Sequence, residues 1–224
     1  MRKAKFIVID GIDGSGKTTQ WYLLAKKLRA EKISYQMVNF PIYQSFFGKL
    51  IKRYLKGDFG DPIKTNSYFS ALPYALDRFF YKEKLDKALR TKKAVLVNRY
   101  MTSNLIYQGA KIKNLKEREK FFKWEEKLEY DLLNLPKPDL VIYLWVPPEI
   151  SFRLIAARQK KVKNKKRDRY EKNLAYQSEV AKISKNLAKK RKNWQMIKCY
   201  ERGILLSRQE IAKRVWEIVK MKIR

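Results

Sequence analysis

A glycine-rich turn between a short apolar run and an amphipathic segment most strongly limits what this chain can fold into. Residues 6–9 (FIVI) form an apolar run typical of a strand that is buried on both faces. Residues 17–30 carry apolar side chains at the spacing of one helix face. Between them, residues 11–18 (GIDGSGKT) fit the pattern G-x-x-x-x-G-K-S/T, which predicts a phosphate-binding loop.

The residue types of this loop have a chemical reason. Its glycines permit a tight turn in which backbone N–H groups point at phosphate oxygens, and the positive end of the following helix adds to the attraction. Lys17 is expected to reach the β- and γ-phosphates of ATP, and the Thr18 hydroxyl to bind Mg²⁺. The predicted ATP site comprises Gly11, Ile12, Asp13, Gly14, Ser15, Gly16, Lys17, Thr18 and Thr19.

Further strands alternate with helices along the chain. Strands are expected at residues 35–40, 94–97, 140–146 and 194–199, and helices at 46–55, 68–90 (bent at Pro73), 103–110, 117–133, 148–158, 173–192 and 207–222. Ser207 with Glu210 predicts a capping box for the last helix. Buried strands alternating with helices predict an α/β fold, a parallel sheet of five strands covered on both faces. We expect a single domain over residues 1–224.

The charge is the unusual part of the composition. Lys and Arg total 53 against 22 Asp and Glu, a net charge of +31. Such an excess attracts phosphates on nucleotides, nucleic acid or membranes, but its spread along the chain also fits a lysine-rich surface. We expect no nucleic-acid partner, because no RNP-type signature or zinc spacing occurs. The chain has no His, which excludes Ser-His-Asp chemistry and a His-ligated zinc site.

Cysteine content and hydropathy predict a cytoplasmic location. The single cysteine, Cys199, cannot form an internal disulfide and suits a reducing compartment. After the charged start, only residues 6–9 form an apolar run, so no signal peptide is expected. No segment approaches the length of a membrane span, and we expect no membrane contact.

Five short segments occur in an order that is typical of one enzyme family. They are FIVIDGIDGSGKTTQ at 6–20, FPIY at 40–43, a 74–78 segment ending in Asp-Arg, NRYMTSNLIYQGA at 98–110 and DRYE at 168–171. With these segments the chain resembles the thymidylate kinase family over nearly its whole length. The resemblance implies a three-layer P-loop kinase fold with a lid, transfer of a phosphate from Mg-ATP to dTMP, and a homodimer formed through helix faces.

The resemblance also implies a role for each matching position. Asp13 would contact the acceptor sugar hydroxyl or a Mg²⁺-bound water, Arg99 would grip the acceptor phosphate, and Arg78 would hydrogen-bond the base. Tyr74 stands where an aromatic side chain stacks on thymine, and Tyr170 would close over the deoxyribose. The implied acceptor site comprises Asp13, Phe40, Tyr43, Tyr74, Arg78, Arg99, Ser103, Asn104, Tyr107, Gln108 and Tyr170. Taken singly, Tyr74 also fits a packed core, and Asn104 and Gln108 fit a solvated helix face.

A basic segment precedes Tyr170. Residues 160–172 (KKVKNKKRDRYEK) carry eight basic and two acidic residues without apolar periodicity. The resemblance implies a lid, at about residues 158–173, over the phosphates of ATP. Family members differ in whether the phosphate loop or the lid carries a catalytic Arg, and Gly14 here assigns it to the lid. The implied catalytic residues are Lys17, Arg99, Asp13, Arg167 and Arg169, with Arg158 and Arg153 as further lid candidates. A solvated basic loop or a nucleic-acid patch is the alternative reading.

Three positions depart from the family pattern. Asn98 ends the third strand where the family has Asp near Mg²⁺, and Asp10 is a carboxylate that could partly substitute. Trp145 and Ile42 stand where many relatives have polar residues. Two alternatives therefore stay open: a kinase for another nucleoside monophosphate or a deoxynucleoside, and a catalytically weakened, nucleotide-gated protein that binds nucleic acid or a partner.

Overall fold

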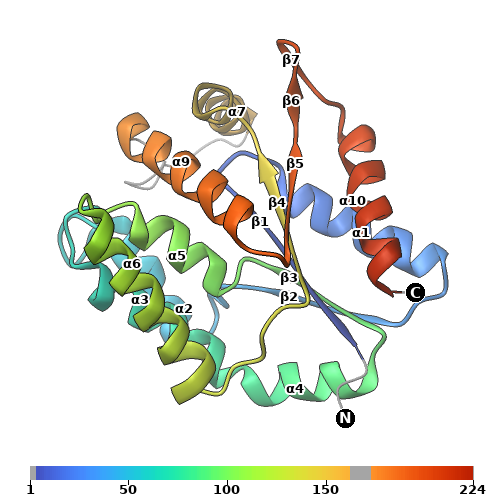
Figure 1. Ribbon diagram of the computed structural model, residues 1–224, viewed down its shortest axis with the longest axis horizontal. Coiled ribbons are helices and arrows are strands. Elements are labelled where there is room, and N and C mark those ends of the chain that lie inside the picture. The colour runs from blue at the N-terminus through green and yellow to red at the C-terminus, as the bar shows by residue number, and fades with distance from the viewer. Residues whose placement is uncertain (1–3, 162–172, 224) are drawn as a thin grey trace.

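A parallel sheet forms the middle layer of the computed structural model, which describes residues 4–161 and 173–223. The five strands lie in the order β2-β3-β1-β4-β5 (Figure 1), and every neighbouring pair is parallel. The strands are β1 (Lys5–Gly11), β2 (Tyr35–Asn39), β3 (Ala94–Asn98), β4 (Leu140–Trp145) and β5 (Trp194–Lys198). This is the predicted sheet, and the predicted α/β fold is confirmed.

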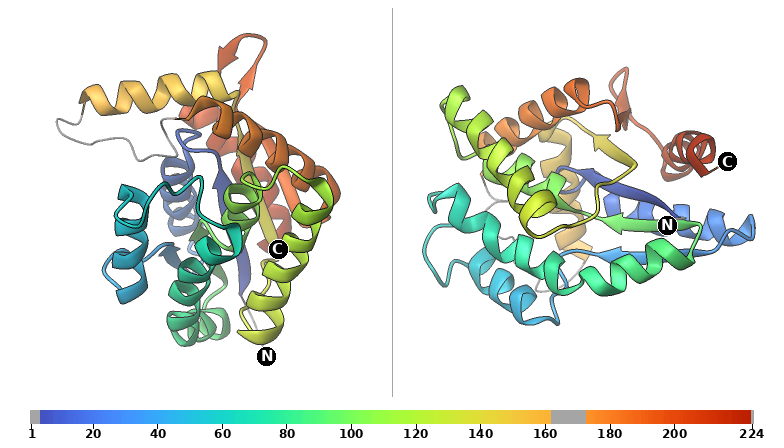
Figure 2. Two further views of the ribbon diagram at one scale, coloured as in Figure 1. Left: turned by 90° about the vertical axis from the view of Figure 1, so that its left-hand side faces the viewer. Right: turned by 60° about the horizontal axis from the view of Figure 1, so that its bottom comes forward.

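Helices cover both faces of the sheet. On one face α1 (Lys17–Ala30) packs beside α10 (Arg208–Ile223), and on the other lie α5 (Met101–Gly109) and α9 (Leu174–Lys190) (Figure 1). Outside α5 stand α2 (Phe46–Lys56), α3 (Ser67–Phe80) and α6 (Leu115–Glu126), while α4 (Lys82–Thr91) lies beside β3. At the carboxyl ends of the strands lie α7 (Pro148–Lys161) and a hairpin of β6 (Tyr200–Glu201) and β7 (Ile204–Leu205) (Figure 2).

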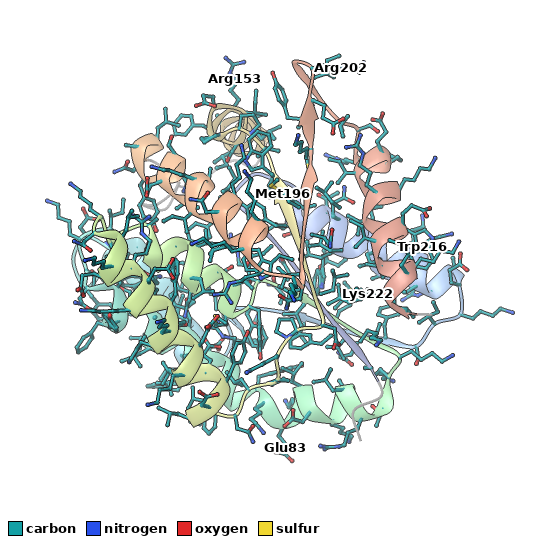
Figure 3. All side chains as sticks on the ribbon, in the orientation of Figure 1. Glu83, Arg153, Met196, Arg202, Trp216 and Lys222 are labelled. Carbon is teal, nitrogen blue, oxygen red and sulfur yellow. The ribbon has the colours of Figure 1, made fainter. Side chains whose placement is uncertain are left out.

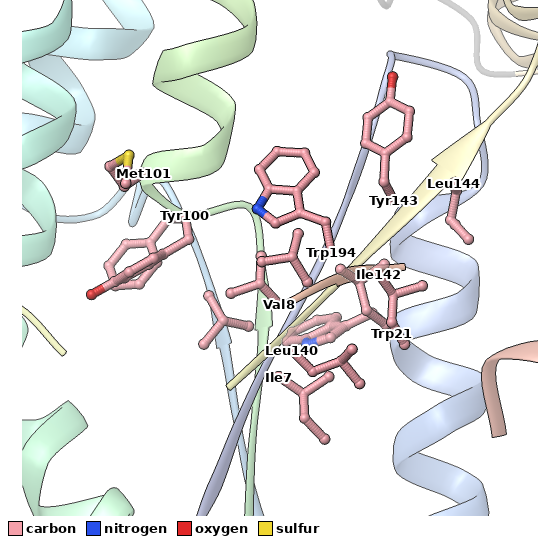
Figure 4. Packing of buried hydrophobic residues seen from close by; sticks show 14 of the residues in the cluster. Ile7, Val8, Trp21, Tyr100, Met101, Leu140, Ile142, Tyr143, Leu144 and Trp194 are labelled. Atoms are coloured by element: carbon pink, nitrogen blue, oxygen red, sulfur yellow. The ribbon is translucent and has the colours of Figure 1, made fainter. Parts of the chain in front are cut away.

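The inner strands are apolar because both of their faces are buried. Every residue of β3 is buried, as is each residue of β1 after Lys5. Figure 4 shows sheet residues such as Val8 and Ile142 with Trp21 of α1 and Trp194 of β5. The Trp21 indole N–H donates to the Leu96 carbonyl at 3.0 Å, so the buried polar group is satisfied. The sheet is thus a rigid base for the residues at its carboxyl end.

For two of the long predicted helices, the structure differs from the prediction. The segment 68–90 divides at Tyr81 into α3 and α4, whereas Pro73 lies inside α3. The Tyr81 ring packs edge-to-face on Phe40, with ring centroids 5.8 Å apart, so a tertiary contact accompanies the break.

The second difference concerns the segment 117–133. It begins earlier, capped by Asn114, and its last part is the π-helix η1 (Lys127–Leu132). A π turn inserts a residue and shifts the face of the helix after it, so a pattern with a constant period of about 3.6 residues does not predict which side chains of this segment are buried. Glu125 and Glu129 are both fully buried here, on the side that faces α3 and α5.

The termini of the other elements follow the sequence closely. The capping box of α10 is present: Ser207 Oγ accepts from the Glu210 N–H at 3.1 Å, and Glu210 accepts from the Ser207 N–H at 2.7 Å. The hairpin of β6 and β7 was missed, since strands of two residues give no periodic signal. Across the described residues, no helix is long and apolar enough to cross a membrane.

Candidate active site

The phosphate loop joins β1 to α1 through glycines in unusual conformations. Gly14 and Gly16 have φ angles of +80° and +88°. A Cβ atom on Gly11 would lie 2.6 Å from the Leu144 carbonyl oxygen, so a side chain does not fit there. Gly16 is the N-cap of α1 and has no side chain to cover the N–H groups of the first turn. These N–H groups form the anion-binding end of the helix.

Lys17 is held by the carbonyl groups of its own loop. Its Nζ donates to the Gly11 and Ile12 oxygens, each at 2.8 Å, and lies 3.5 Å from Asp13 Oδ1. Burial and the nearby charge of Arg99 lower the pKa of Lys17 to about 8, although Asp13 opposes the shift. The amine is therefore placed at the phosphate loop, but its hydrogen bonds go to the protein.

Asp13 joins the phosphate loop to β3 through an ion pair with Arg99. Burial raises the pKa of Asp13, but the charges of Arg99 and Lys17 outweigh this and hold it at about 2. Arg99 has a φ of +63°, uncommon for a residue with a side chain, and its guanidinium lies over the Tyr107 ring at 5.2 Å. Asp13 is thus ionised at neutral pH and fixes Arg99 beside the loop.

A pocket opens next to Asp13, between α3 and α5. Its volume is about 610 Å³, including the solvent-filled opening. This size is typical of small-molecule sites. The pocket is lined by every predicted acceptor residue that lies within the described part of the chain. The structure therefore brings these residues together. Sequence reasoning missed Pro41, Leu55 and Tyr100; the first and last are in predicted motifs, whereas Leu55 gave no signal. The lining consists of Asp13, Phe40, Pro41, Tyr43, Leu55, Tyr74, Arg78, Arg99, Tyr100, Ser103, Asn104, Tyr107 and Gln108.

The far end of the pocket holds a buried charged cluster. Arg78 makes a two-bond ion pair with Glu129, with Nε donating to Oε2 at 2.8 Å. Asn104 Nδ2 donates to Glu125 Oε1 at 2.6 Å and to the Ala71 carbonyl at 3.2 Å. Burial, reinforced by the charge of Glu129, raises the pKa of Glu125 well above its usual range. Neither carboxylate was predicted, because acidic residues four apart in an amphipathic helix usually face solvent.

Asp77 organises the turn that carries Phe40. Its carboxylate accepts from the Ile42 N–H at 2.8 Å and from the Ser45 hydroxyl at 2.5 Å, and Ser45 in turn caps α2. The adjacent residues Asp77 and Arg78 therefore have different roles. Asp77 holds the pocket wall, and Arg78 faces the pocket.

The Asn98 amide lies beside Thr18, where the phosphate loop would place Mg²⁺. Asn98 Nδ2 donates to Asn39 at 2.6 Å and contacts Thr18 Oγ1 at 3.4 Å. The buried Asn98 Oδ1 has no hydrogen-bond partner among the described residues. Asp10 instead accepts from Gly11, Thr102 and Ser103, so both of its oxygens are engaged within the protein.

No cluster of three or more acidic, His or Cys side chains occurs in residues 4–161 and 173–223. Such a cluster is not required, because Mg²⁺ usually takes one or two protein oxygens together with waters and substrate phosphates. The Thr18 hydroxyl is such an oxygen. Asn98 turns its NH₂ group towards Thr18, so its carbonyl would become a second ligand only after rotation of the amide.

Helix α7 packs directly on the phosphate loop. The Ser151 hydroxyl donates to the Asp13 carbonyl, and a Cβ on Gly14 would lie 2.8 Å from the Ser151 carbonyl oxygen and 3.0 Å from Ile155. The loop therefore has no room for an Arg at position 14. Arg153 is exposed and points away from the molecule (Figure 3). The Arg158 side chain, Arg167, Arg169 and Tyr170 lie outside the described residues, and their roles stay predictions.

A parallel sheet, a phosphate loop opening α1 and a polar pocket beside that loop define a P-loop kinase that acts on a small phosphate acceptor. The thymidylate kinase family model matches residues 9–211, and the chain belongs to the thymidylate kinase family.

Named relatives agree with this assignment. The thymidylate kinase of Mycobacterium tuberculosis is 30% identical over 183 residues, which cover 81% of this chain and 85% of the relative. A probable thymidylate kinase of Pyrobaculum aerophilum is 37% identical over 155 residues, 68% and 70% of the two chains. The solved thymidylate kinase of Candida albicans has the same fold, with a TM-score of 0.72, 23% identity and coverage of 99% of this chain and 93% of that one.

Proposed function

We propose that this protein phosphorylates dTMP to dTDP with ATP as the phosphate donor. The observation that carries the proposal is the polarity of the pocket. One end holds Arg78 and Asn104, and the other holds Asp13 and Arg99 beside the phosphate loop. A nucleoside monophosphate spans such a pocket with its base at the first end and its phosphate at the second.

The base end of the pocket suits a thymine ring. A guanidinium only donates hydrogen bonds, so Arg78 selects a ring carbonyl. Both Nδ2 hydrogens of Asn104 are used by Ala71 and Glu125, so its Oδ1 is the atom left to accept from the ligand. Thymine offers a carbonyl next to a ring N–H, whereas cytosine offers an amino group next to a ring acceptor. Half-buried Tyr74 supplies an aromatic face beside them.

The phosphate end supplies positioning and positive charge. The attacking acceptor oxygen is already ionised, so the transfer needs no general base. Lys17 would exchange its loop carbonyls for phosphate oxygens, and Arg99 would bind the acceptor phosphate while Asp13 contacts the sugar hydroxyl. The Thr18 hydroxyl would hold Mg²⁺, which when bound neutralises charge on the phosphate oxygens. Residues 1–224 would carry out this reaction as one domain.

We further propose a homodimer through α2 and α3. Phe46 and Phe80 are 77% and 72% exposed, and their rings join Phe47 and Phe79 in one cluster with centroids 5.2–5.8 Å apart. Contiguous exposed aromatic side chains are typical of protein interfaces. Phe80→Glu should yield a monomer in sedimentation, whereas Tyr22→Glu, on α1 at the opposite face, should leave the dimer intact. A monomeric wild-type protein would overturn this proposal.

A cytoplasmic location fits the chemistry of Cys199. The cysteine is free and buried, and burial raises the pKa of its thiol to about 12, so it is inert towards disulfide exchange. We propose that the protein works in the cytoplasm, where its nucleotide substrates are available.

The test is ADP formation from Mg-ATP with dTMP, dUMP, dCMP, UMP and thymidine as separate acceptors. We expect turnover chiefly with dTMP. Turnover with dUMP should be lower because uracil lacks the ring methyl group and buries less apolar surface. Turnover with dCMP should be small because the base end of the pocket distinguishes the edges of the two rings. Lys17→Met serves as the inactive control against contaminating kinases. Turnover with another acceptor and none with dTMP would overturn the proposal.

A further inference from the structure

Two buried carboxylates stand behind the base end of the pocket, outside its lining. Glu125 and Glu129 are both 0% exposed, and Arg78, the cation between them, is 2% exposed. Glu129 takes the two-bond ion pair, whereas Glu125 Oε1 lies 3.9 Å from Arg78 Nη2, beyond hydrogen-bond distance. Glu125 therefore has a different function from that of Glu129.

The charge of the cluster indicates which carboxyl group keeps a proton. Two carboxylates and one guanidinium would leave a net negative charge in a site closed to water, which is unfavourable. One proton balances the cluster. The raised pKa of Glu125 places the proton there, because Glu129 is the partner that binds Arg78.

The contacts of Asn104 fix which end of its amide faces the ligand. Nδ2 donates to Ala71 and to Glu125, from two different helices. The Glu125 proton belongs on Oε2, which no donor among the described residues reaches, so Oε1 stays an acceptor. The opposite orientation would place Oδ1 against the Ala71 carbonyl, which only accepts, and would leave Glu125 Oε1 without its donor. Asn104 and Glu125 thus form a pair in which the buried acid sets the polarity of the side chain that lines the pocket.

We propose that Glu125 is a positioning residue that, as a neutral acid, orients the Asn104 amide so that its carbonyl accepts from a pyrimidine ring N–H, and so sets the preference for thymine over cytosine. This inference rests on the proposed function. It assigns a specificity role to a residue that has no contact with the ligand, acting through Asn104.

The experiment compares kcat/KM for dTMP and dCMP in three proteins. Glu125→Gln keeps a neutral group with an acceptor oxygen, so the dTMP:dCMP ratio should stay within about threefold of wild type. Glu125→Met removes the acceptor but leaves the Arg78–Glu129 pair balanced. Its ratio should fall by about tenfold, with dTMP losing through KM, as expected when one buried hydrogen bond is lost. General damage to the fold would lower both substrates and leave the ratio unchanged.

A second background tests whether the effect passes through Asn104. In Asn104→Ala, the further change Glu125→Met should leave the ratio unaltered, because the amide that Glu125 orients is absent. An unchanged ratio in Glu125→Met, or Glu125→Gln as impaired as Glu125→Met, would overturn the inference.

The orientation of Asn104 can also be tested in the wild-type protein, so this test does not require the variants to fold. The two side-chain NH₂ protons of Asn104 should exchange slowly with solvent, and a proton that exchanges at the solvent rate would contradict the orientation. The proposed function fails separately: wild-type protein that does not prefer dTMP overturns it, whereas a wild-type dTMP preference that survives Glu125→Met overturns only the role of Glu125.

Discussion

The two ends of the site hold their charged side chains in different ways. At the base end, Arg78 is bonded to a carboxyl group of η1, 51 residues further along the chain, and Asn104 to one of α6, 21 residues further along. At the phosphate end, Lys17 is bonded to carbonyl groups of Gly11 and Ile12, only six and five residues away. The side chains of the base end are therefore held by distant parts of the chain, whereas the Lys17 amine of the phosphate end is held by its own loop.

This difference implies two ways of binding. The base end presents its donor and acceptor before any ligand arrives, so little reorganisation is needed there. At the phosphate end, Lys17 must release two carbonyls before it can reach a phosphate. Base recognition should accordingly depend on the stability of the fold, whereas phosphate binding should depend on the charge of one amine.

The largest effect is expected from Lys17→Met. It removes the cation of the phosphate loop and should lower kcat/KM by about 10³-fold, as losses of transition-state charge stabilisation do. Affinity for dTMP, measured by calorimetry without ATP, should change little because the base end is untouched. Lys27→Met, on the exposed face of α1 with 44% of its side chain accessible, is the matched control. Loss of dTMP binding in Lys17→Met would contradict the separation of the two ends.

The next effect concerns the stability of the base end. Glu129→Gln removes the two-bond ion pair of Arg78, and loss of hydrogen bonds to a buried group costs about 1–3 kcal/mol. Ionisation of Glu125, 3.9 Å from Arg78, restores the charge balance but not those bonds. Denaturant unfolding measures the loss. Glu201→Gln breaks the exposed pair with Arg214 on the hairpin and should leave stability nearly unchanged, because exposed ion pairs contribute little. Equal losses of stability in the two variants would show that the buried Arg78–Glu129 pair stabilises the fold no more than an exposed pair does.

A smaller effect follows from pH. The pKa of Lys17 is about 8 in the unliganded protein, mainly because of burial and then because of Arg99. Above that pH the amine is mostly neutral, so ATP binding must take up a proton. Affinity for ATP should be level below pH 7.5 and fall towards about tenfold per pH unit above pH 8. Affinity for dTMP should stay level between pH 7.5 and 9, because its contacts are arginines, an amide and Asp13, whose pKa is about 2. A parallel fall for dTMP would contradict the comparison.

The phosphate end could be predicted from the sequence in more detail than the base end. Its strand, glycines and helix are local signals, and the predicted helix 17–30 matches α1 to the residue. The lining of the base end could be predicted only through resemblance. Its support could not, because burial of Glu125 and Glu129 depends on a π turn and on partners in other helices. A sequence pattern records which side chains share a face, but not which distant group neutralises them.

Asn98 combines a feature that the sequence shows with contacts that only the structure shows, and its substitution gives the smallest predicted effect. Its departure from the family pattern was visible in the sequence, but its contacts with Thr18 and Asn39 were not. A carboxylate there would add a charged oxygen ligand beside Thr18, so Asn98→Asp should lower the Mg²⁺ concentration for half-maximal activity by a few fold. It should also increase the thermal stabilisation that Mg-ADP gives over ADP alone, which is a readout independent of turnover. Asn39→Asp, one strand further from the phosphate loop, is the control for added charge. An equal gain in both variants, or none in Asn98→Asp, would show that position 98 does not contribute a metal ligand.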